Sequence, residues 1–94
     1  MGPYRMRRVR LMISGRVQGV FFRASCADRA EELGLAGWVR NAPAGGVETV
    51  FEGEDAEVDA MIGWCRKGPR SATVDHVEVL EEVPTGVRGF RITH

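Results

Sequence analysis

The sequence predicts an α+β domain in which two helices cover one face of a mostly antiparallel sheet. Stretches in which apolar residues recur at every second position indicate strands, and two stretches with apolar residues at helical spacing indicate helices. Glycine and proline residues fall between these stretches and mark the turns. The elements follow in the order β-α-β-β-α-β plus a short C-terminal strand, which is the ferredoxin-like, or split β-α-β, arrangement.

The first strand and the first helix flank a glycine-containing turn. Val9, Leu11 and Ile13 alternate with other residues, as in a strand with one buried face. The helix is expected from about residue 22 or 23 to residue 33, with an apolar stripe along one side. Gly34 follows it, in the position where a left-handed residue commonly ends a helix.

A hairpin and a second helix are expected in the middle of the chain. Residues 37–41 and 47–52 indicate two strands, joined by a turn that contains one proline and two glycines. Asp55 is the candidate N-cap of the second helix, which should end at residues 67–69. The apolar face of that helix is expected to consist of Val58, Met61, Ile62 and Cys65.

Two more strands complete the expected sheet. Val74, Val77 and Val79 indicate a fourth strand, and a short strand is expected from about Phe90 to Ile92. The 94 residues allow a single domain. We assign this domain to residues 6–94 and interpret residues 1–5 as an N-terminal extension.

Composition narrows the class of protein. The 13 basic and 13 acidic residues balance, so the chain as a whole does not resemble a basic nucleic-acid-binding domain. No apolar stretch reaches the length of a membrane span and no signal peptide is recognisable, so we expect a cytoplasmic protein without a membrane partner. Cys26 and Cys65 are expected to be buried apolar residues rather than metal ligands or nucleophiles.

The charges are distributed unevenly along the chain. Residues 1–45 contain eight arginines and three acidic residues, whereas residues 46–94 contain five basic and ten acidic residues. A basic first half would suit an anionic ligand, but the counts alone favour an ordinary solvated charge pattern. Glu48 and Glu52, which alternate along the third strand, are likewise expected to face solvent.

The segment from Gly15 to Arg23 carries the main functional signal. It joins the first strand to the first helix, where helical N–H groups lack internal partners and the helix dipole favours an anion. Its glycines allow consecutive N–H groups to curl around an anion, and the guanidinium of Arg23 can bind two phosphate oxygens. Its spacing fits neither the nucleotide P-loop nor the dinucleotide fingerprint. From the residues alone, a phosphate loop and an ordinary turn followed by a solvated arginine are equally open.

Two motifs resemble those of the acylphosphatase family. Residues 15–23, Gly-Arg-Val-Gln-Gly-Val-Phe-Phe-Arg, match the family pattern G-x-V-Q-G-V-x-F-R. A second match begins at residues 37–41, Gly-Trp-Val-Arg-Asn, and continues with Gly45, Val47 and Gly53 at the family's spacing. The resemblance extends over essentially the whole chain from about Met6 and agrees with the predicted order of elements.

The resemblance implies a small hydrolase that cleaves the carboxyl–phosphate bond of acyl phosphates without a metal or cofactor. It implies that Arg23 binds phosphate and that Asn41 orients the attacking water. It also implies that backbone N–H groups of the loop hold the phosphoryl oxygens, namely those of Val17, Gln18, Gly19, Val20 and Phe21. We therefore expect a monomer whose partner is a small acyl phosphate and which binds no nucleic acid.

The chemistry of such a site is coherent in physical terms. The carboxylate leaving group is weakly basic and needs little help from a general acid. The transition state of phosphoryl transfer spreads its charge over three oxygens, so binding those oxygens and aligning a water suffice. The Asn41 amide can accept a hydrogen bond from water but cannot take its proton, so a phosphate oxygen of the substrate is the expected acceptor.

Several residues can also be explained without a catalytic role, and two other functions fit the predicted fold. Asn41 also fits a turn, because a proline and two glycines follow it. His76 and His94 lie outside both motifs and are expected at or near the surface, and Trp38 and Trp64 are expected to pack. Two alternative functions are an RNA-binding module on the same fold and a regulatory domain that binds a small anion without turnover.

Overall fold

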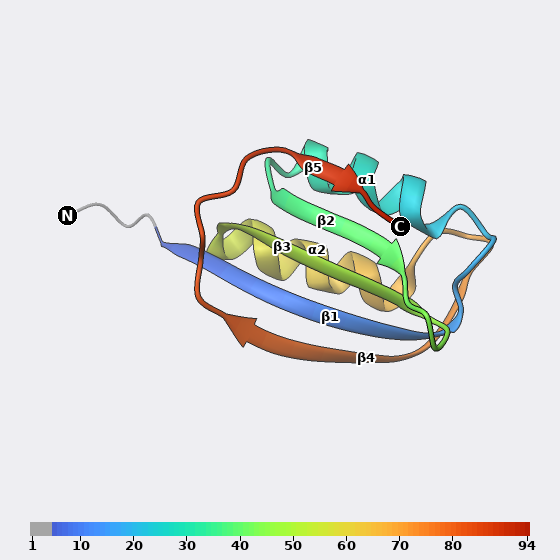
Figure 1. The fold of residues 1–94 in the computed structure, drawn as a ribbon. Helices are drawn as coiled ribbons and strands as arrows, with labels where there is room; N and C mark the ends of the chain where they lie inside the picture. The colour runs from blue at the N-terminus through green and yellow to red at the C-terminus, as the bar shows by residue number, and fades with distance from the viewer. Residues whose placement is uncertain (1–4) are drawn as a thin grey trace.

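The computed structural model describes residues 5–94 of the chain. In chain order the elements are β1 (Met6–Arg16), α1 (Phe22–Glu32), β2 (Ala36–Asn41), β3 (Val47–Glu54), α2 (Asp55–Lys67), β4 (Thr73–Glu82) and β5 (Phe90–Ile92). The strands form one sheet in the order β4-β1-β3-β2-β5, and both helices lie on the same face of it (Figure 1). The fold is therefore the ferredoxin-like α+β arrangement that the sequence predicts.

The pairing of the strands sets which side chains reach the core. Strand β1 is antiparallel to both β3 and β4, and β2 is antiparallel to β3. Strand β5 adds to β2 in parallel and forms one edge of the sheet. Val9, Leu11 and Ile13 are buried, which confirms the predicted buried face of the first strand. The β1–α1 connection lies at the end of the sheet toward which β1, β2 and β5 run (Figure 1).

The start of α2 differs from the expectation. Because β3 extends to Glu54 and runs directly into the helix, Glu54 occupies the N-cap position in an extended conformation without a side-chain capping bond. Asp55 is instead the first helical residue, where its carboxylate complements the helix dipole and forms an ion pair with Arg7. Gly34, with a φ of 70°, follows α1 as expected.

Strand β1 begins at Met6, directly after the expected N-terminal extension. Residues 1–4 of the expected extension lie outside the described residues. The carbonyl oxygen of Arg5 accepts a hydrogen bond of 3.1 Å from the backbone N–H of Asp55. Contact with the rest of the domain is therefore already present at residue 5.

The core lies between the sheet and the two helices. Cys26 of α1 and Cys65 of α2 are fully buried there as free thiols, as expected. Phe22 packs against Trp64 with ring centroids 5.4 Å apart. Trp38 lies on the opposite, open face of the sheet, with two arginine guanidinium groups 5.6 and 5.9 Å from its ring centroid.

Glu48 and Glu52 do not face solvent, so that expectation is wrong. Their exposed fractions are 7% and 1%, because arginines of neighbouring strands lie across the open face of the sheet and pair with them. Arg8 donates to Glu52 at 2.6 Å, and both Arg10 and Arg40 donate to Glu48. Alternation along β3 identifies the open face correctly, but it does not reveal that ion pairs cover that face.

Glu52 also holds the segment between β4 and β5 against the sheet. Its carboxylate accepts hydrogen bonds from the backbone N–H groups of Gly86 (2.8 Å) and Thr85 (3.2 Å) in addition to the guanidinium of Arg8. Burial raises the pKa of Glu52, but these donors lower it by more, so the pKa lies below its ordinary value. The carboxylate is therefore charged in the folded protein at neutral pH, and its pairing favours the fold.

Ion pairs between distant segments account for part of the uneven distribution of charge along the chain. Basic residues of the first half pair with acidic residues of the second half, either on neighbouring strands or on α2. The pairs are Arg7 with Asp55, Asp59 and Glu81, Arg8 with Glu52 and Glu82, Arg10 with Glu48 and Glu82, and Arg40 with Glu48. Four of the eight arginines in residues 1–45 are therefore used in these ion pairs of the fold, and their presence is no sign of an anion-binding surface.

Replacing Glu52 with glutamine should remove the buried charge and retain the size of the side chain. We expect Glu52→Gln to lower the free energy of unfolding at pH 7 by about 3 kcal/mol, because Arg8 loses a buried partner. The folded-state pKa of Glu52 is depressed, so its contribution is present above the unfolded-state pKa, about 4.3, and is lost as the pH falls through the folded-state pKa. Urea unfolding of wild type and variant at pH 7 and pH 3 measures this, and the difference between the two proteins should shrink at pH 3.

The matched control is Glu81→Gln, which removes an exposed carboxylate paired with Arg7. We expect it to change the free energy of unfolding far less than Glu52→Gln does, because exposed ion pairs contribute little to stability. A Glu52→Gln effect as small as that of the control, or equally large at both pH values, would contradict the buried ion pair as a source of stability.

Candidate active site

The connection between β1 and α1 forms a tight corner at one end of the sheet (Figure 1). Strand β1 ends at Arg16 and α1 begins at Phe22, so residues 17–21 make the turn. Phe21 occupies the N-cap position with a φ of 64°, and within the described residues it is the only non-glycine residue with a positive φ. This conformation is disfavoured for a residue with a side chain and persists only where the surrounding structure imposes it.

Gly15 lets β1 and β4 approach closely just before the corner. The register of the two strands shifts between Ser14 and Gly15, and Gly15 has a φ of 126°. A side chain at this position would place its Cβ atom 2.2 Å from the carbonyl oxygen of Thr73. Val17, which is 1% exposed, then anchors the turn in the core. The first glycine of the motif therefore serves to direct the chain into the corner.

The N–H groups of the corner have no partner within the protein. In the described part of the chain, no backbone N–H of residues 17–24 donates a hydrogen bond to another protein group. The first turn of α1 contains no acidic residue, whereas the first turn of α2 contains Asp55 and Glu57. The start of α1 therefore offers unpaired donors and an uncompensated helix dipole, which together suit an anion.

Arg23 lies half-buried in the first turn of α1, beside these donors. Among the described residues no carboxylate forms an ion pair with it, in contrast to the arginines of the sheet such as Arg8 and Arg10. A guanidinium group cannot lose its charge near neutral pH and presents its N–H donors in a planar fork. Arg23 thus keeps its donors available for an external anion.

Gln18 ties the corner to the turn between β2 and β3. Its Nε2 donates to the carbonyl oxygen of Gly46 at 2.7 Å and to that of Ala42 at 3.2 Å. On the other side, the hydroxyl of Ser71 donates to the carbonyl oxygen of Val20 at 2.7 Å. The structure therefore brings the two sequence motifs together and fixes the corner from two sides.

Asn41 is the last residue of β2 and lies next to that turn. It follows Val39 by two residues, and since Val39 is buried toward the helices, alternation places Asn41 on the face of the sheet that α1 covers. The turn is closed by backbone bonds of 3.0 Å, from Ala42 to Gly46 and from Gly45 to Ala42. The Oδ1 of Asn41 is buried and has no hydrogen-bond partner among the described residues. The turn does not use this side chain, which leaves an acceptor for a ligand or a water molecule.

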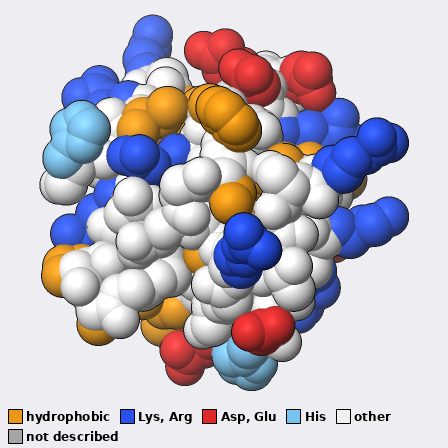
Figure 2. All heavy atoms as spheres, turned by 90° about the vertical axis from the view of Figure 1, so that its right-hand side faces the viewer, with side chains coloured by type: hydrophobic (Ala, Val, Ile, Leu, Met, Phe, Trp, Pro, Cys, Tyr) orange, Lys and Arg blue, Asp and Glu red, His pale blue; other side chains and the backbone are white. Residues whose placement is uncertain are grey.

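A hollow of about 470 Å³ opens beside Arg23. The corner and the first turn of α1 line one side of it, with Val17, Gly19, Phe21, Phe22, Arg23 and Ala24, and Ile92 and His94 line the other. Figure 2 shows this end of the molecule, where hydrophobic side chains gather next to basic and histidine side chains. The motifs indicate the first group but not Ile92 and His94, because only the parallel pairing of β5 with β2 brings the C-terminal residues here.

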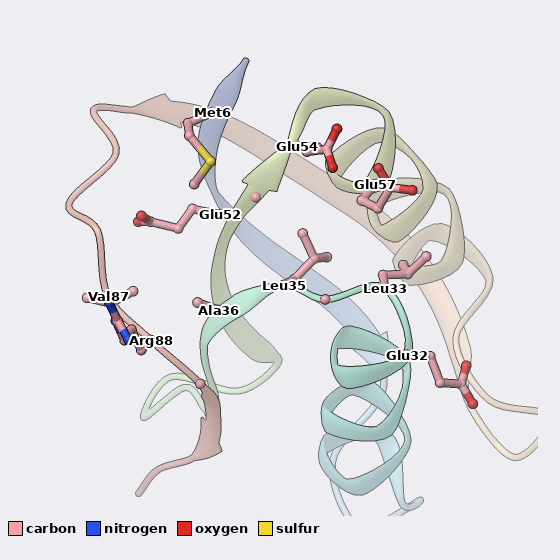
Figure 3. A pocket seen from close by; sticks show the side chains of 13 residues that line it. Met6, Glu32, Leu33, Leu35, Ala36, Glu52, Glu54, Glu57, Val87 and Arg88 are labelled. Atoms are coloured by element: carbon pink, nitrogen blue, oxygen red, sulfur yellow. The ribbon is translucent and has the colours of Figure 1, made fainter. Parts of the chain in front are cut away.

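A larger hollow, of about 640 Å³, lies at the opposite end of the sheet (Figure 3). Four acidic residues, Glu32, Glu52, Glu54 and Glu57, and a single basic residue, Arg88, line this hollow. Carboxylates gathered around a cavity repel an anionic ligand. The hollow beside Arg23 is therefore the better candidate for binding a phosphate group.

The described residues contain no group of three or more histidine, cysteine or acidic side chains that could hold a metal ion. His76 is exposed on β4 and does not line the hollow beside Arg23. Within the same residues, no helix is long and apolar enough to cross a membrane.

Comparisons with known proteins point to one family. A family model described as Acylphosphatase matches residues 9–92. The acylphosphatase of Rubrobacter xylanophilus is 58% identical over 87 residues, which cover 92% of this chain and 79% of that protein. An acylphosphatase structure from Coxiella burnetii superimposes with a TM-score of 0.92 at 38% identity and covers 99% of this chain and 100% of its own. For the acylphosphatase of Bacillus subtilis the TM-score is 0.90 at 31% identity, with coverage of 94% and 99%.

Proposed function

Since the chain belongs to the acylphosphatase family, whose members are hydrolases that act on acyl phosphates, we propose that it hydrolyses the carboxyl–phosphate bond by direct attack of water. The products are a carboxylate and inorganic phosphate, and no metal ion or cofactor takes part. The observation that carries the proposal is the set of unpaired N–H groups at the β1–α1 corner, with Arg23 beside them.

In this proposal the corner binds the phosphoryl group. The N–H groups of residues 17–21 surround the phosphoryl oxygens, and the planar fork of Arg23 spans two of them. The charge of a loose phosphoryl-transfer transition state lies on its three equatorial oxygens. Donors that are already fixed in place stabilise this charge without reorganising during the reaction. The Arg23 guanidinium supplies a permanent positive charge, and the N-terminus of α1 adds the partial positive charge of the helix dipole. Together they balance the negative charge of the bound phosphoryl group.

Asn41 then orients the attacking water. Its buried Oδ1, which lacks a protein partner, accepts a hydrogen bond from the water behind phosphorus. A new bond forms between the water oxygen and phosphorus while the phosphorus–oxygen bond to the acyl group breaks, and the electron pair leaves with the carboxylate. The proton of the water passes to a phosphate oxygen, because an amide oxygen is too weak a base to accept it.

The proposal also includes the oligomeric state and the location of the protein. All residues of the proposed site come from a single chain and from elements within residues 6–94. We therefore propose that these residues act as one monomeric catalytic domain in the cytoplasm.

Turnover of a simple acyl phosphate in the presence of a chelator tests the proposed function. Incubation with benzoyl phosphate or acetyl phosphate and excess EDTA should release inorganic phosphate at a rate proportional to protein concentration. Phosphate binding without turnover would indicate a regulatory anion-binding domain instead. Salt-sensitive RNA binding without turnover would indicate the RNA-binding alternative.

Loss of the Arg23 guanidinium should nearly abolish catalysis. We expect Arg23→Ala to lower kcat/KM by about 10³-fold or more, as for other charged clamps on a transferring phosphoryl group. Arg23→Lys should be almost as poor, because a point charge replaces the planar fork. Steady-state phosphate release measures both, with Arg66→Ala as the control, since Arg66 is an exposed helical arginine outside the hollow. Near-normal activity in either Arg23 variant would refute the proposed clamp.

Loss of the Asn41 amide should affect turnover far more than phosphate binding. We expect Asn41→Ala to lower kcat by about 10²-fold or more, because the water loses its orienting acceptor. The inhibition constant of inorganic phosphate should change by less than about 3-fold, because Arg23 and the corner still bind the anion. A parallel loss of phosphate affinity, or of thermal stability, would show that Asn41 supports the corner instead of the water.

A further inference from the structure

Strand β5 places an aliphatic side chain beside the phosphate-binding corner. In the parallel ladder Val39 is the partner of Ile92, and the N–H of Thr93 donates to the carbonyl oxygen of Val39 at 2.8 Å. Since Val39 is buried toward the helices, this register places Ile92 on the same face, where it lines the hollow next to Arg23. Ile92 is nevertheless 41% exposed, because β5 is an edge strand.

Phe21 exposes a second apolar group to the same hollow. Its side chain is 79% exposed, on a backbone that is held in the left-handed region. An exposed ring contributes little to the packing of the fold, and a less bulky residue would adopt this backbone more readily. Exposed apolar side chains gathered beside an anion-binding group are typical of a site whose ligand has one charged and one apolar end.

The charges of the hollow exclude one class of acyl group. Among the side chains that line it, none is acidic, and that of Arg23 is the only one with a permanent charge. An acyl group that carries an ammonium group would find no acidic side chain to pair with there, and would lie near the Arg23 guanidinium. The hollow therefore suits an uncharged, apolar acyl group.

In-line displacement requires the leaving group to occupy space away from the attacking water. In phosphoryl transfer the attacking and leaving oxygens lie roughly in line on opposite sides of phosphorus. Asn41, which orients the water in the proposed function, does not line the hollow, whereas Arg23 does. A leaving group that occupies the hollow would contact Ile92 and Phe21.

We propose that Ile92 and Phe21 form an acyl-group subsite, which makes the enzyme favour acyl phosphates with aromatic or branched aliphatic acyl groups over acetyl phosphate. This inference rests on the proposed acylphosphatase activity and adds to it the chemical class of the acyl group. Ile92 is the specificity-determining residue that can be tested alone, because its backbone belongs to β5 and not to the phosphate-binding corner.

The test is a change in substrate preference in Ile92→Thr. Threonine keeps the β-branched shape that suits a strand but places a hydroxyl group in the subsite. The values of kcat/KM for benzoyl phosphate and acetyl phosphate are measured for wild type and variant. We expect the benzoyl-to-acetyl ratio to fall by about 3- to 10-fold in the variant. Because both substrates are measured on the same preparation, the ratio does not depend on the fraction of folded protein.

The matched control is Leu80→Thr on β4, the other edge strand, where Leu80 is 44% exposed. This variant should leave the ratio unchanged. The inhibition constants of phenylphosphonate and methylphosphonate give a second readout that needs no turnover, and their ratio should change in the same direction in Ile92→Thr. Ile92→Ala serves as a second variant if Ile92→Thr does not fold.

The possible outcomes separate this inference from the proposed function. An unchanged ratio in the Ile92 variants, or an equal fall in Leu80→Thr, would overturn the acyl-group subsite while hydrolysis by wild type upholds the proposed function. If wild type releases phosphate from neither acyl phosphate, the proposed function fails and the subsite fails with it. A selective fall in the ratio for the Ile92 variants supports both.

Discussion

The proposed site depends on the β1–α1 corner, residues 17–21. The backbone N–H groups of this corner have no partner in the described part of the protein, while a carbonyl oxygen and a side chain of the corner form hydrogen bonds that fix its position. Ser71 binds the carbonyl oxygen of Val20, and Gln18 uses its side-chain amide to reach Gly46 and Ala42 across the β2–β3 turn. None of these contacts uses a backbone N–H of the corner. The corner is therefore fixed in position while its N–H groups remain free to donate hydrogen bonds. Such a site can bind an anion without rearranging. The left-handed backbone of Phe21 is part of the same arrangement, because it turns the chain into α1 at the right place.

The distribution of charge keeps that end suitable for an anion. On the open face of the sheet Glu48 and Glu52 of β3 are paired with arginines, so their charges are locally neutralised despite their burial. The first turn of α2 and the hollow at the far end carry glutamates and aspartates, whereas the first turn of α1 and the hollow beside Arg23 carry no acidic side chain. Acidic side chains are thus abundant in this domain but absent from the surface that would meet a dianion. Because exposed charges more than about 10 Å apart are largely screened at physiological salt, local placement matters more than the net charge of zero.

Local patterns predict most of this structure, and they fail where distant segments meet. Alternation and helical spacing find the strands and helices, since each is decided by neighbours along the chain. The N-cap prediction at Asp55 is wrong because β3 runs directly into α2, a junction that the sequence pattern does not distinguish from a short loop. Glu48 and Glu52 are misassigned to solvent because their partners lie on other strands. Arg23 and Asn41 can be proposed from motifs, but Ile92 cannot, since its place beside the corner depends on the long-range pairing of β5 with β2.

The two parts of the proposed site differ in the same way: one is formed by local structure and the other partly by the long-range pairing of β5. The groups proposed to bind phosphate and water lie on the β1–α1 corner and the end of β2, where the backbone is fixed by the core, by Gln18 and by a close approach at Gly15. The apolar surface next to them comes partly from an edge strand that pairs on one side only, so its side chains can change without disturbing a second strand. A phosphate group is common to all acyl phosphates, and its recognition needs fixed geometry. The acyl group varies among them, and in the proposed subsite it would lie against an edge strand, which pairs on one side only. Substitutions on β5 should therefore alter the selectivity for the acyl group and leave the binding of the phosphoryl oxygens unchanged.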